Sequence, residues 1–227
     1  LLATYRNGPV SSNVRRQMQQ SRPSPSATFV GAKHPPSGTA LDFWRWAYGD
    51  FLDDDVKGAF AEWMVHKLLG ISSERRVSWA NSDIITPDGV RIEVKSTAFW
   101  QSWKLLDEFG QPEPTPKHSP ILDVKKIRFQ GLMARDSTAA PDPTKGKNFK
   151  SHLYVFAFQN NSDPKTWDAL DLTQWEFYLV PAAKLIELGW QSISLATLRH
   201  KFMRMNADEF SIHGRAAVET AAARVDA

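Results

Sequence analysis

Apolar and polar positions along the chain form helical and extended segments that alternate. Apolar residues at helical spacing predict a short, aromatic-rich helix over 41–48 and a longer helix over 56–69. The longer helix is expected to begin at an N-cap formed by Asp54 or Asp55 and to end at Gly70. We expect the aromatic residues of the short helix to cover part of the core.

Runs of β-branched and aromatic residues predict the strands. These runs cover 76–80, 83–86, 90–97, 152–159 and 175–180. The fourth run is apolar at nearly every position, which is typical of a strand covered on both faces. Pro181 is expected to open another helix, which runs to residue 188 and ends at Gly189. The alternation of helices and strands predicts an α/β protein with a central mixed sheet flanked by helices.

Composition and charge describe a globular domain that carries a polar arm. The 227 residues are 42% apolar and include no cysteine, which excludes disulfides, thiolate metal ligands and cysteine nucleophiles. Residues 1–40 hold five basic side chains and no acidic one. Such an arm suits a polyanionic partner and equally a solvated flexible segment. We therefore expect an arm over 1–40, a folded domain over 41–213 and an alanine-rich tail over 214–227.

Neither a membrane-spanning run nor a signal-peptide pattern is present in the sequence. We therefore expect a cytoplasmic protein with no membrane association. The six histidines show no paired spacing typical of zinc sites, and the sequence contains neither a phosphate-binding loop nor a serine nucleophile elbow. Nucleotide hydrolysis and serine esterase chemistry are excluded on this basis.

The sequence Thr-Pro-Asp-Gly at 86–89 predicts the register of the hairpin around it. This sequence suits a type I turn followed by a glycine bulge, so Thr86 is expected to pair with Val90. Counting outward from that pair places Ile84 opposite Ile92. Both isoleucines are then expected to point into the core, because side chains on paired positions share one face of a sheet.

One step further along the same register, two carboxylates are expected side by side. Asp83 pairs with Glu93, and Lys95 shares their face two positions later. Like charges on neighbouring strands destabilise a sheet, so a shared proton, a basic neighbour or a hard cation is expected to offset them. An exposed hairpin, in which Arg91, Glu93 and Lys95 form ordinary surface ion pairs, is the alternative.

A third carboxylate, Glu62, comes from the helix over 56–69. It lies on or beside the apolar stripe of that helix, where an unpaired charge is costly. Glu62 is therefore expected to face a partner. The partner is either the carboxylate pair with its cation or a basic residue in an internal salt bridge, for instance Lys95 or Arg91. An exposed position on a polar face is the remaining alternative.

The order of a helix glutamate, a strand aspartate and Glu93-Val94-Lys95 resembles the PD-(D/E)xK nuclease superfamily, which has the restriction-endonuclease-like fold. The resemblance implies that Asp83, Glu93 and Glu62 hold magnesium or manganese, and that Lys95 acts near the attacking water and the scissile phosphate. It covers about 41–103. Ser82 stands where many members have proline, a position that varies within the superfamily.

The resemblance implies a metal-dependent nuclease that hydrolyses phosphodiester bonds, with DNA as the expected substrate and restriction, phage defence or repair as the expected role. It also implies a homodimer, because many nucleases of this type cut both strands as dimers. The motif itself does not choose between DNA and RNA. Two alternatives stay open: a non-catalytic nucleic-acid-binding module on the same fold, and a nuclease toxin delivered to other cells.

Contacts with nucleic acid are expected from five further residues. Gln101 resembles a glutamine that some members of the superfamily carry after the motif, and Trp103 is placed to stack on bases. Lys125, Lys126 and Arg128 form a basic cluster that suits a phosphate backbone. Each of these residues also suits an ordinary place on the surface or in the core.

Overall fold

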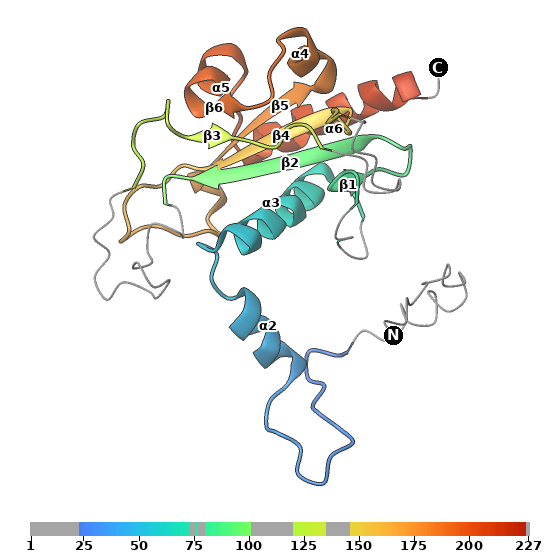
Figure 1. The fold of residues 1–227 in the computed structure, drawn as a ribbon, viewed down its shortest axis with the longest axis vertical. Coiled ribbons are helices and arrows are strands. Elements are labelled where there is room, and N and C mark those ends of the chain that lie inside the picture. Colours follow the sequence, from blue (N-terminus) through green and yellow to red (C-terminus); the bar gives the residue numbers. More distant parts are fainter. Residues whose placement is uncertain (1–22, 73–75, 77–79, 101–119, 135–145, 226–227) are drawn as a thin grey trace, which may run out of the picture. The chain divides into compact units, whose positions relative to one another are not determined.

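The fold comes from a computed structural model that describes residues 23–72, 76, 80–100, 120–134 and 146–225 (Figure 1). Contacts divide the chain into two units, Leu1–Asp50 and Phe51–Ala227. This division differs from the boundary expected after residue 40, because helix α2 (Ala40–Tyr48) belongs to the first unit.

In the first unit, α2 begins at a capping box. Thr39 Oγ1 accepts the backbone N–H of Asp42, and the Asp42 carboxylate accepts the backbone N–H of Thr39. No residue of α2 is buried, and Trp46 is 84% exposed. The first unit by itself does not bury this helix, and the expectation that it covers part of the core stays a prediction. Its aromatic residues lie on more than one side of the helix, so that a single packing face does not bury them all.

In the second unit, helix α3 (Asp54–Leu69) confirms the longer predicted helix. Asp53 is the N-cap, and its carboxylate accepts the N–H groups of two first-turn residues. The predicted caps, Asp54 and Asp55, instead lie in the first turn, because three consecutive aspartates offer the same capping chemistry. Gly70 ends the helix in the left-handed conformation, with φ 69°.

A four-stranded mixed sheet in the order β1-β2-β4-β5 confirms the predicted architecture (Figure 1). Strand β2 is antiparallel to β1 and parallel to β4, and β4 is antiparallel to β5. A separate pair of short strands, β3 and β6, forms a two-stranded sheet. The strands span β1 (Ile84–Ile85), β2 (Arg91–Ala98), β3 (Arg128–Phe129), β4 (Leu153–Gln159), β5 (Trp175–Pro181) and β6 (Ile193–Ser194).

Helices cover the four-stranded sheet on both faces (Figure 1). Helices α3 and α6 (Ala207–Val225) pack on the face that presents Ile92 and Val94. The opposite face is covered by β3 and β6 together with the short helices α4 (Ala182–Glu187) and α5 (Leu195–Lys201). The 3-10 turn η2 (Leu172–Gln174) leads into β5. Each face therefore has its own apolar core.

Near the end of the chain, the predicted helix over 181–188 is present, whereas the predicted tail over 214–227 is largely helical. The helix expected over 181–188 is α4, and Gly189 follows it with φ 65°. Helix α6 continues past residue 214, where a separate tail was expected, because small alanines at helical spacing pack against the core as well as larger residues do.

The hairpin between β1 and β2 has the predicted register. Thr86 donates its N–H to the carbonyl of Val90 at 2.9 Å, and Gly89 has φ 77°. Ile84 pairs with Ile92, and both are buried. Residues at alternate positions of β2 therefore face away from α3, and these include the charged residues of the candidate site.

Two further predictions concern a strand over 76–80 and membrane-spanning segments. Of the strand expected over 76–80, residues 77–79 lie outside the described residues, and neither Arg76 nor Ala80 lies in a strand. Among the described residues, no helix is long and apolar enough to cross a bilayer.

Candidate functional site

Glu93 and Lys95 form an ion pair on one face of β2. Lys95 Nζ lies 2.7 Å from Glu93 Oε1, and the two side chains are 25% and 16% exposed, respectively. Tyr154 and Phe156 of β4 lie beside them in register. This ion pair is on the face opposite α3, as the alternation along the strand predicts.

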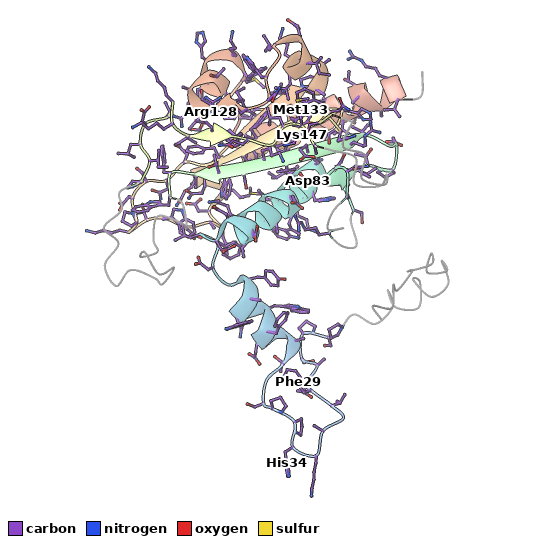
Figure 2. All side chains as sticks on the ribbon, in the orientation of Figure 1. Phe29, His34, Asp83, Arg128, Met133 and Lys147 are labelled. Atoms are coloured by element: carbon purple, nitrogen blue, oxygen red, sulfur yellow. The ribbon has the colours of Figure 1, made fainter. Side chains whose placement is uncertain are left out.

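Asp83 lies at the edge of the sheet, where the pairing of β1 with β2 ends. Its Oδ2 accepts the backbone N–H of Val94 at 2.7 Å. The carboxylate thus takes the place that a strand carbonyl would have in the ladder. In Figure 2, Asp83 lies between β2 and α3, which agrees with this contact. Asp83 is therefore beside the strand that carries Glu93, at the edge between the two faces.

The electrostatic environment of Asp83 includes both other candidate carboxylates. Burial raises the pKa of Asp83 to about 7, and the negative charges of Glu93 and Glu62 act in the same direction. The N–H of Val94 and the ammonium of Lys95 oppose this shift only in part. The three carboxylates are therefore close enough to repel one another, and a proton or a cation at Asp83 relieves that repulsion.

Glu62 is buried on α3, and its partner is Arg76. The Arg76 guanidinium donates from Nε and Nη2 to the two carboxylate oxygens, with 2.7 Å from Nη2 to Oε1. Hydrogen bonding to Glu62 raises the pKa of Arg76, and the charge of Asp83 adds to this effect. The expected internal salt bridge exists, but with a different partner. Lys95 is paired with Glu93 instead, and Arg91 donates its Nε to a backbone carbonyl.

Two buried serines lie next to the site residues Asp83 and Glu93. Ser151 Oγ donates to Ser82 Oγ at 2.9 Å and lies 3.5 Å from Glu93 Oε2. Ser82, which departs from the proline of the superfamily pattern, thus belongs to a buried hydroxyl pair next to Asp83. Ser151 was not predicted as a site residue, because it comes from the segment before β4 and no local sequence pattern marks it.

The loop that follows β3 passes over Lys95. A Cβ added at Gly131 would lie 3.9 Å from Lys95 Nζ, and Gly131 has φ 65°. In the same loop, the carbonyl of Leu132 accepts the hydroxyl hydrogen of Tyr154 at 2.8 Å. Burial raises the pKa of Tyr154 to about 12, and the charge of Glu93 adds to this shift. Tyr154 is therefore a neutral hydrogen-bond donor that anchors the loop.

The carboxylates fit a hard divalent cation by their chemistry. Oxygen ligands are the ones that magnesium and manganese prefer, and Asp83 and Glu93 lie close enough to shift a pKa. Among the described residues, no three acidic or histidine side chains converge as a ready-made metal cluster. The ion pairs explain this, because Arg76 holds Glu62 and Lys95 holds Glu93.

Three of the five predicted nucleic-acid contacts lie on the surface of the described chain. Lys125, Lys126 and Arg128 are exposed, and Arg128 Nη2 donates to Ser192 Oγ at 2.7 Å. They belong to the layer that covers the Lys95 face of the sheet, since Phe129 of β3 packs against Phe156 in that core. The other two, at positions 101 and 103, lie outside the described residues.

Comparisons of this chain with protein-family models, with curated proteins and with solved structures find no match. The case for a function therefore rests on the residues and geometry of the site itself.

Proposed function

We propose that the second unit is a metal-dependent nuclease of the PD-(D/E)xK type, which hydrolyses phosphodiester bonds of DNA on a restriction-endonuclease-like fold. The observation that carries the proposal is the meeting of Asp83, Glu93 and Lys95 at the edge of the sheet. Burial there, together with the negative charges of Glu93 and Glu62, raises the pKa of Asp83 to about 7. An acidic pair can hold a divalent cation, and a neighbouring amine can stabilise negative charge on the phosphoryl group, so the three residues suit metal-assisted hydrolysis of an anionic ester.

Asp83 and Glu93 are the residues that would hold magnesium or manganese, and Glu62 is the third carboxylate within electrostatic reach. A bound divalent cation supplies Lewis acidity at the phosphoryl oxygen and lowers the pKa of a bound water. Arg76 orients Glu62 with two hydrogen bonds to its carboxylate. Ser151 Oγ lies 3.5 Å from Glu93 Oε2 on the buried side of the site.

Lys95 has the role of stabilising negative charge on the phosphoryl group. Its ammonium is held by Glu93 at 2.7 Å and is partly exposed, so it is oriented before substrate arrives. A preoriented cation stabilises the transition state without reorganisation. Lys125, Lys126 and Arg128, on the covering layer of the same face, suit contacts with the DNA backbone.

A second candidate, a non-catalytic nucleic-acid-binding module, is favoured by one specific observation. The ion pairs of Glu62 with Arg76 and of Glu93 with Lys95 satisfy two of the three carboxylates without a metal. In such a module, the acidic residues would be structural, and only the basic surface would bind nucleic acid.

Cleavage assays with matched variants distinguish the two candidates. Duplex, single-stranded and branched DNA are incubated with the full chain in magnesium, manganese or EDTA. We expect cleavage only with a divalent cation. Asp83→Asn should lower the rate by about 100-fold or more, as loss of a major electrostatic contribution does. Asp88→Asn, an exposed aspartate in the neighbouring turn, is the control and should cleave as the wild type does.

Two results would contradict the nuclease proposal or favour the binding module. Wild-type protein that leaves all three DNA substrates intact with both cations contradicts the nuclease proposal. Salt-dependent DNA binding that Asp83→Asn does not change, together with absent cleavage, supports the binding module instead. Circular dichroism of each variant checks that the fold is retained.

A further inference from the structure

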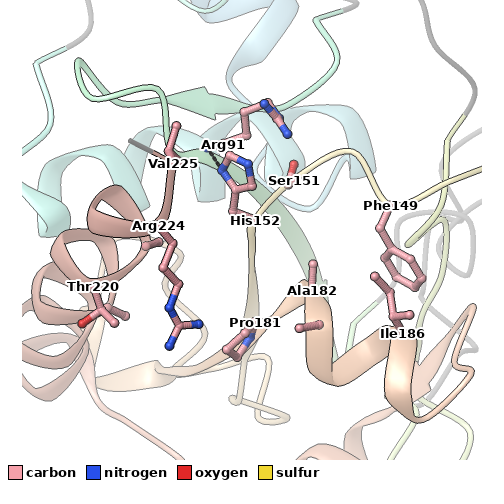
Figure 3. A pocket seen from close by; sticks show the side chains of 13 residues that line it. Arg91, Phe149, Ser151, His152, Pro181, Ala182, Ile186, Thr220, Arg224 and Val225 are labelled. Carbon is pink, nitrogen blue, oxygen red and sulfur yellow. Dashed lines mark hydrogen bonds between the residues drawn. The ribbon is translucent and has the colours of Figure 1, made fainter. Parts of the chain in front are cut away.

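A cavity of about 720 Å³ opens at the end of the sheet where β4 begins and β5 ends (Figure 3). Its walls come from the C-terminal part of α6, from α4 and from the segment before β4. The volume lies within the range of about 300–1,000 Å³ that ligand pockets have. The cavity is separate from the carboxylate cluster but adjoins it.

The charged residues that line the cavity are all basic. Arg91 and Arg224 line it, and no aspartate or glutamate among the described residues does. Within the part of the chain that the structure describes, neither arginine forms an ion pair. Arg91 donates its Nε to the carbonyl of Lys150 at 2.7 Å, which orients the guanidinium and leaves its terminal nitrogens for a ligand. Two guanidinium groups without a carboxylate partner are complementary to an anion.

His152 adds a neutral donor between the arginines, as Figure 3 shows. Its Nδ1 accepts the backbone N–H of Arg91 at 3.1 Å, so the neutral ring carries its proton on Nε2. Burial lowers the pKa of His152, and the positive charge of Arg91 lowers it further. The ring is therefore a hydrogen-bond donor, which again favours a ligand rich in acceptor oxygens.

Apart from Ser151 and Thr220, the rest of the cavity lining is apolar. Phe149, Pro181 and Ile186 line it and offer a ring and aliphatic surface. An inorganic anion would make no use of this surface, whereas the sugar and base of a nucleotide would bury against it. Charge and apolar surface together fit a nucleotide with its phosphate.

Ser151 connects the cavity to the proposed catalytic residues. It lines the cavity, and its Oγ lies 3.5 Å from Glu93 Oε2. Arg91 and Glu93 are two residues apart on β2 and point to the same face, so their Cα atoms are about 6–7 Å apart. An anion bound by Arg91 therefore lies close to Glu93 along β2.

We propose that the cavity between Arg91 and Arg224 binds a phosphate-bearing nucleotide of the DNA strand, next to the bond that the site cleaves. This inference rests on the proposed function and specifies how its substrate is held. The guanidinium groups and His152 bind the phosphate, and the apolar wall holds the sugar and base.

The test measures DNA binding by the full-length chain in an Asp83→Asn background without divalent cations, so that binding is separated from cleavage. A short fluorescein-labelled oligonucleotide, single-stranded or duplex, is the probe in an anisotropy titration. We expect Arg91→Ala and Arg224→Ala each to raise the Kd about tenfold, because each removes a charge-assisted contact to phosphate. Thr220→Glu, on an exposed lining position of α6, introduces a carboxylate and should weaken binding at least as much.

Lys165→Ala is the matched control. Lys165 is exposed in the loop after the opposite end of β4, and its loss changes the net charge equally. It should leave the Kd unchanged. Equal weakening by Lys165→Ala and Arg224→Ala, or an unchanged Kd in all three cavity variants, overturns the cavity proposal. An unchanged melting temperature of each variant shows that the fold is intact.

Failure of this inference is distinguishable from failure of the proposed function. If wild-type protein cleaves DNA with magnesium while the cavity variants bind as before, the nuclease proposal stands and the cavity proposal falls. If the cavity variants lose binding while wild-type protein cleaves nothing, the cavity holds a nucleotide of bound DNA and the nuclease proposal falls.

Discussion

At the residue scale, a substitution of Lys95 should affect metal binding and DNA cleavage in different ways. Its ammonium forms an ion pair with Glu93, a carboxylate that we assign as a ligand of the divalent metal ion. We expect Lys95→Met to bind manganese at least as tightly as the wild type, because a competing charge is removed, and to cleave DNA about 100-fold more slowly or worse. Electron paramagnetic resonance titration with Mn²⁺ and a cleavage time course measure the two effects. A variant that loses manganese binding contradicts this assignment.

Asp83 gives a pH-dependent prediction. Folding raises its pKa from the ordinary value of 3.8 to about 7, mainly through burial. The folded state therefore favours the protonated form, and the resulting stability is present below the unfolded pKa and is lost as the pH rises through about 7. Above that pH, the protein without metal carries a buried negative charge next to Glu93 and Glu62.

A divalent cation offsets that charge only when Asp83 is ionised. We therefore expect magnesium to raise the melting temperature more at about pH 8 than at about pH 6, where a proton already occupies Asp83. Asp83→Asn should remove the difference between the two pH values. Thermal unfolding in magnesium and in EDTA measures it, and an equal effect of magnesium at both pH values would argue against a cation at Asp83.

At the element scale, replacing either of two helical glycines by alanine should change the stability in opposite directions. A Cβ at Gly214 of α6 would lie 2.6 Å from Leu69 Cδ2 at the end of α3, whereas a Cβ at Gly58 of α3 meets nothing within 4 Å. Gly214→Ala should destabilise the protein by about 1–3 kcal/mol through overpacking. Gly58→Ala should stabilise it by about 0.5–1 kcal/mol, because alanine restricts the unfolded chain and favours helix.

Chemical unfolding of the two variants in parallel measures these free energies, and each variant is the control for the other. Stabilisation by both changes would show that α3 and α6 do not approach each other closely at Gly214, whereas destabilisation by both would contradict the prediction for Gly58. Preserved circular dichroism at low denaturant checks that neither change alters the helices themselves.

The elements also show what local sequence determines. The turn at 86–89 predicts the register of β1 and β2, because proline and glycine restrict the backbone within four residues. The ends of α3 follow from its aspartates and Gly70 in the same way. By contrast, β3 and β6 were not predicted, since a strand of two residues is too short to show an alternating pattern.

The partners of the site residues depend on contacts that no local pattern encodes. Glu93 and Lys95 could be predicted as neighbours because they belong to one strand. Arg76 reaches Glu62 from 14 positions away, and Ser151 reaches Glu93 from 58 positions away. The tertiary fold decides which cation neutralises a buried carboxylate, and so local sequence did not indicate Arg76 as the salt-bridge partner of Glu62.

At the scale of the whole molecule, the two units differ in how much they bury. Every buried apolar residue of the described chain comes from Val56 onward, whereas α2 buries none. Because residues 1–50 form a unit of their own, removing them should change the stability of the second unit by less than about 1 kcal/mol and its melting temperature by less than about 2–4 °C. Scanning calorimetry of residues 51–227 beside the full chain measures this, and a shorter chain that does not unfold cooperatively contradicts it.

The first unit should instead contribute to DNA binding. Residues 1–40 hold five basic side chains and no acidic one. Each contact between a basic side chain and a phosphate adds about 0.9 to the slope of log K against log salt concentration, through counterion release. We expect residues 51–227 to cleave DNA with the divalent-cation dependence of the full chain but to bind it with a shallower salt dependence. A full-length chain with the five basic residues replaced by glutamine is the matched control, and it should behave as the shorter chain does. If that variant keeps the salt dependence of the wild type, the charges of the arm do not contact DNA, and the basic surface of the second unit accounts for binding alone.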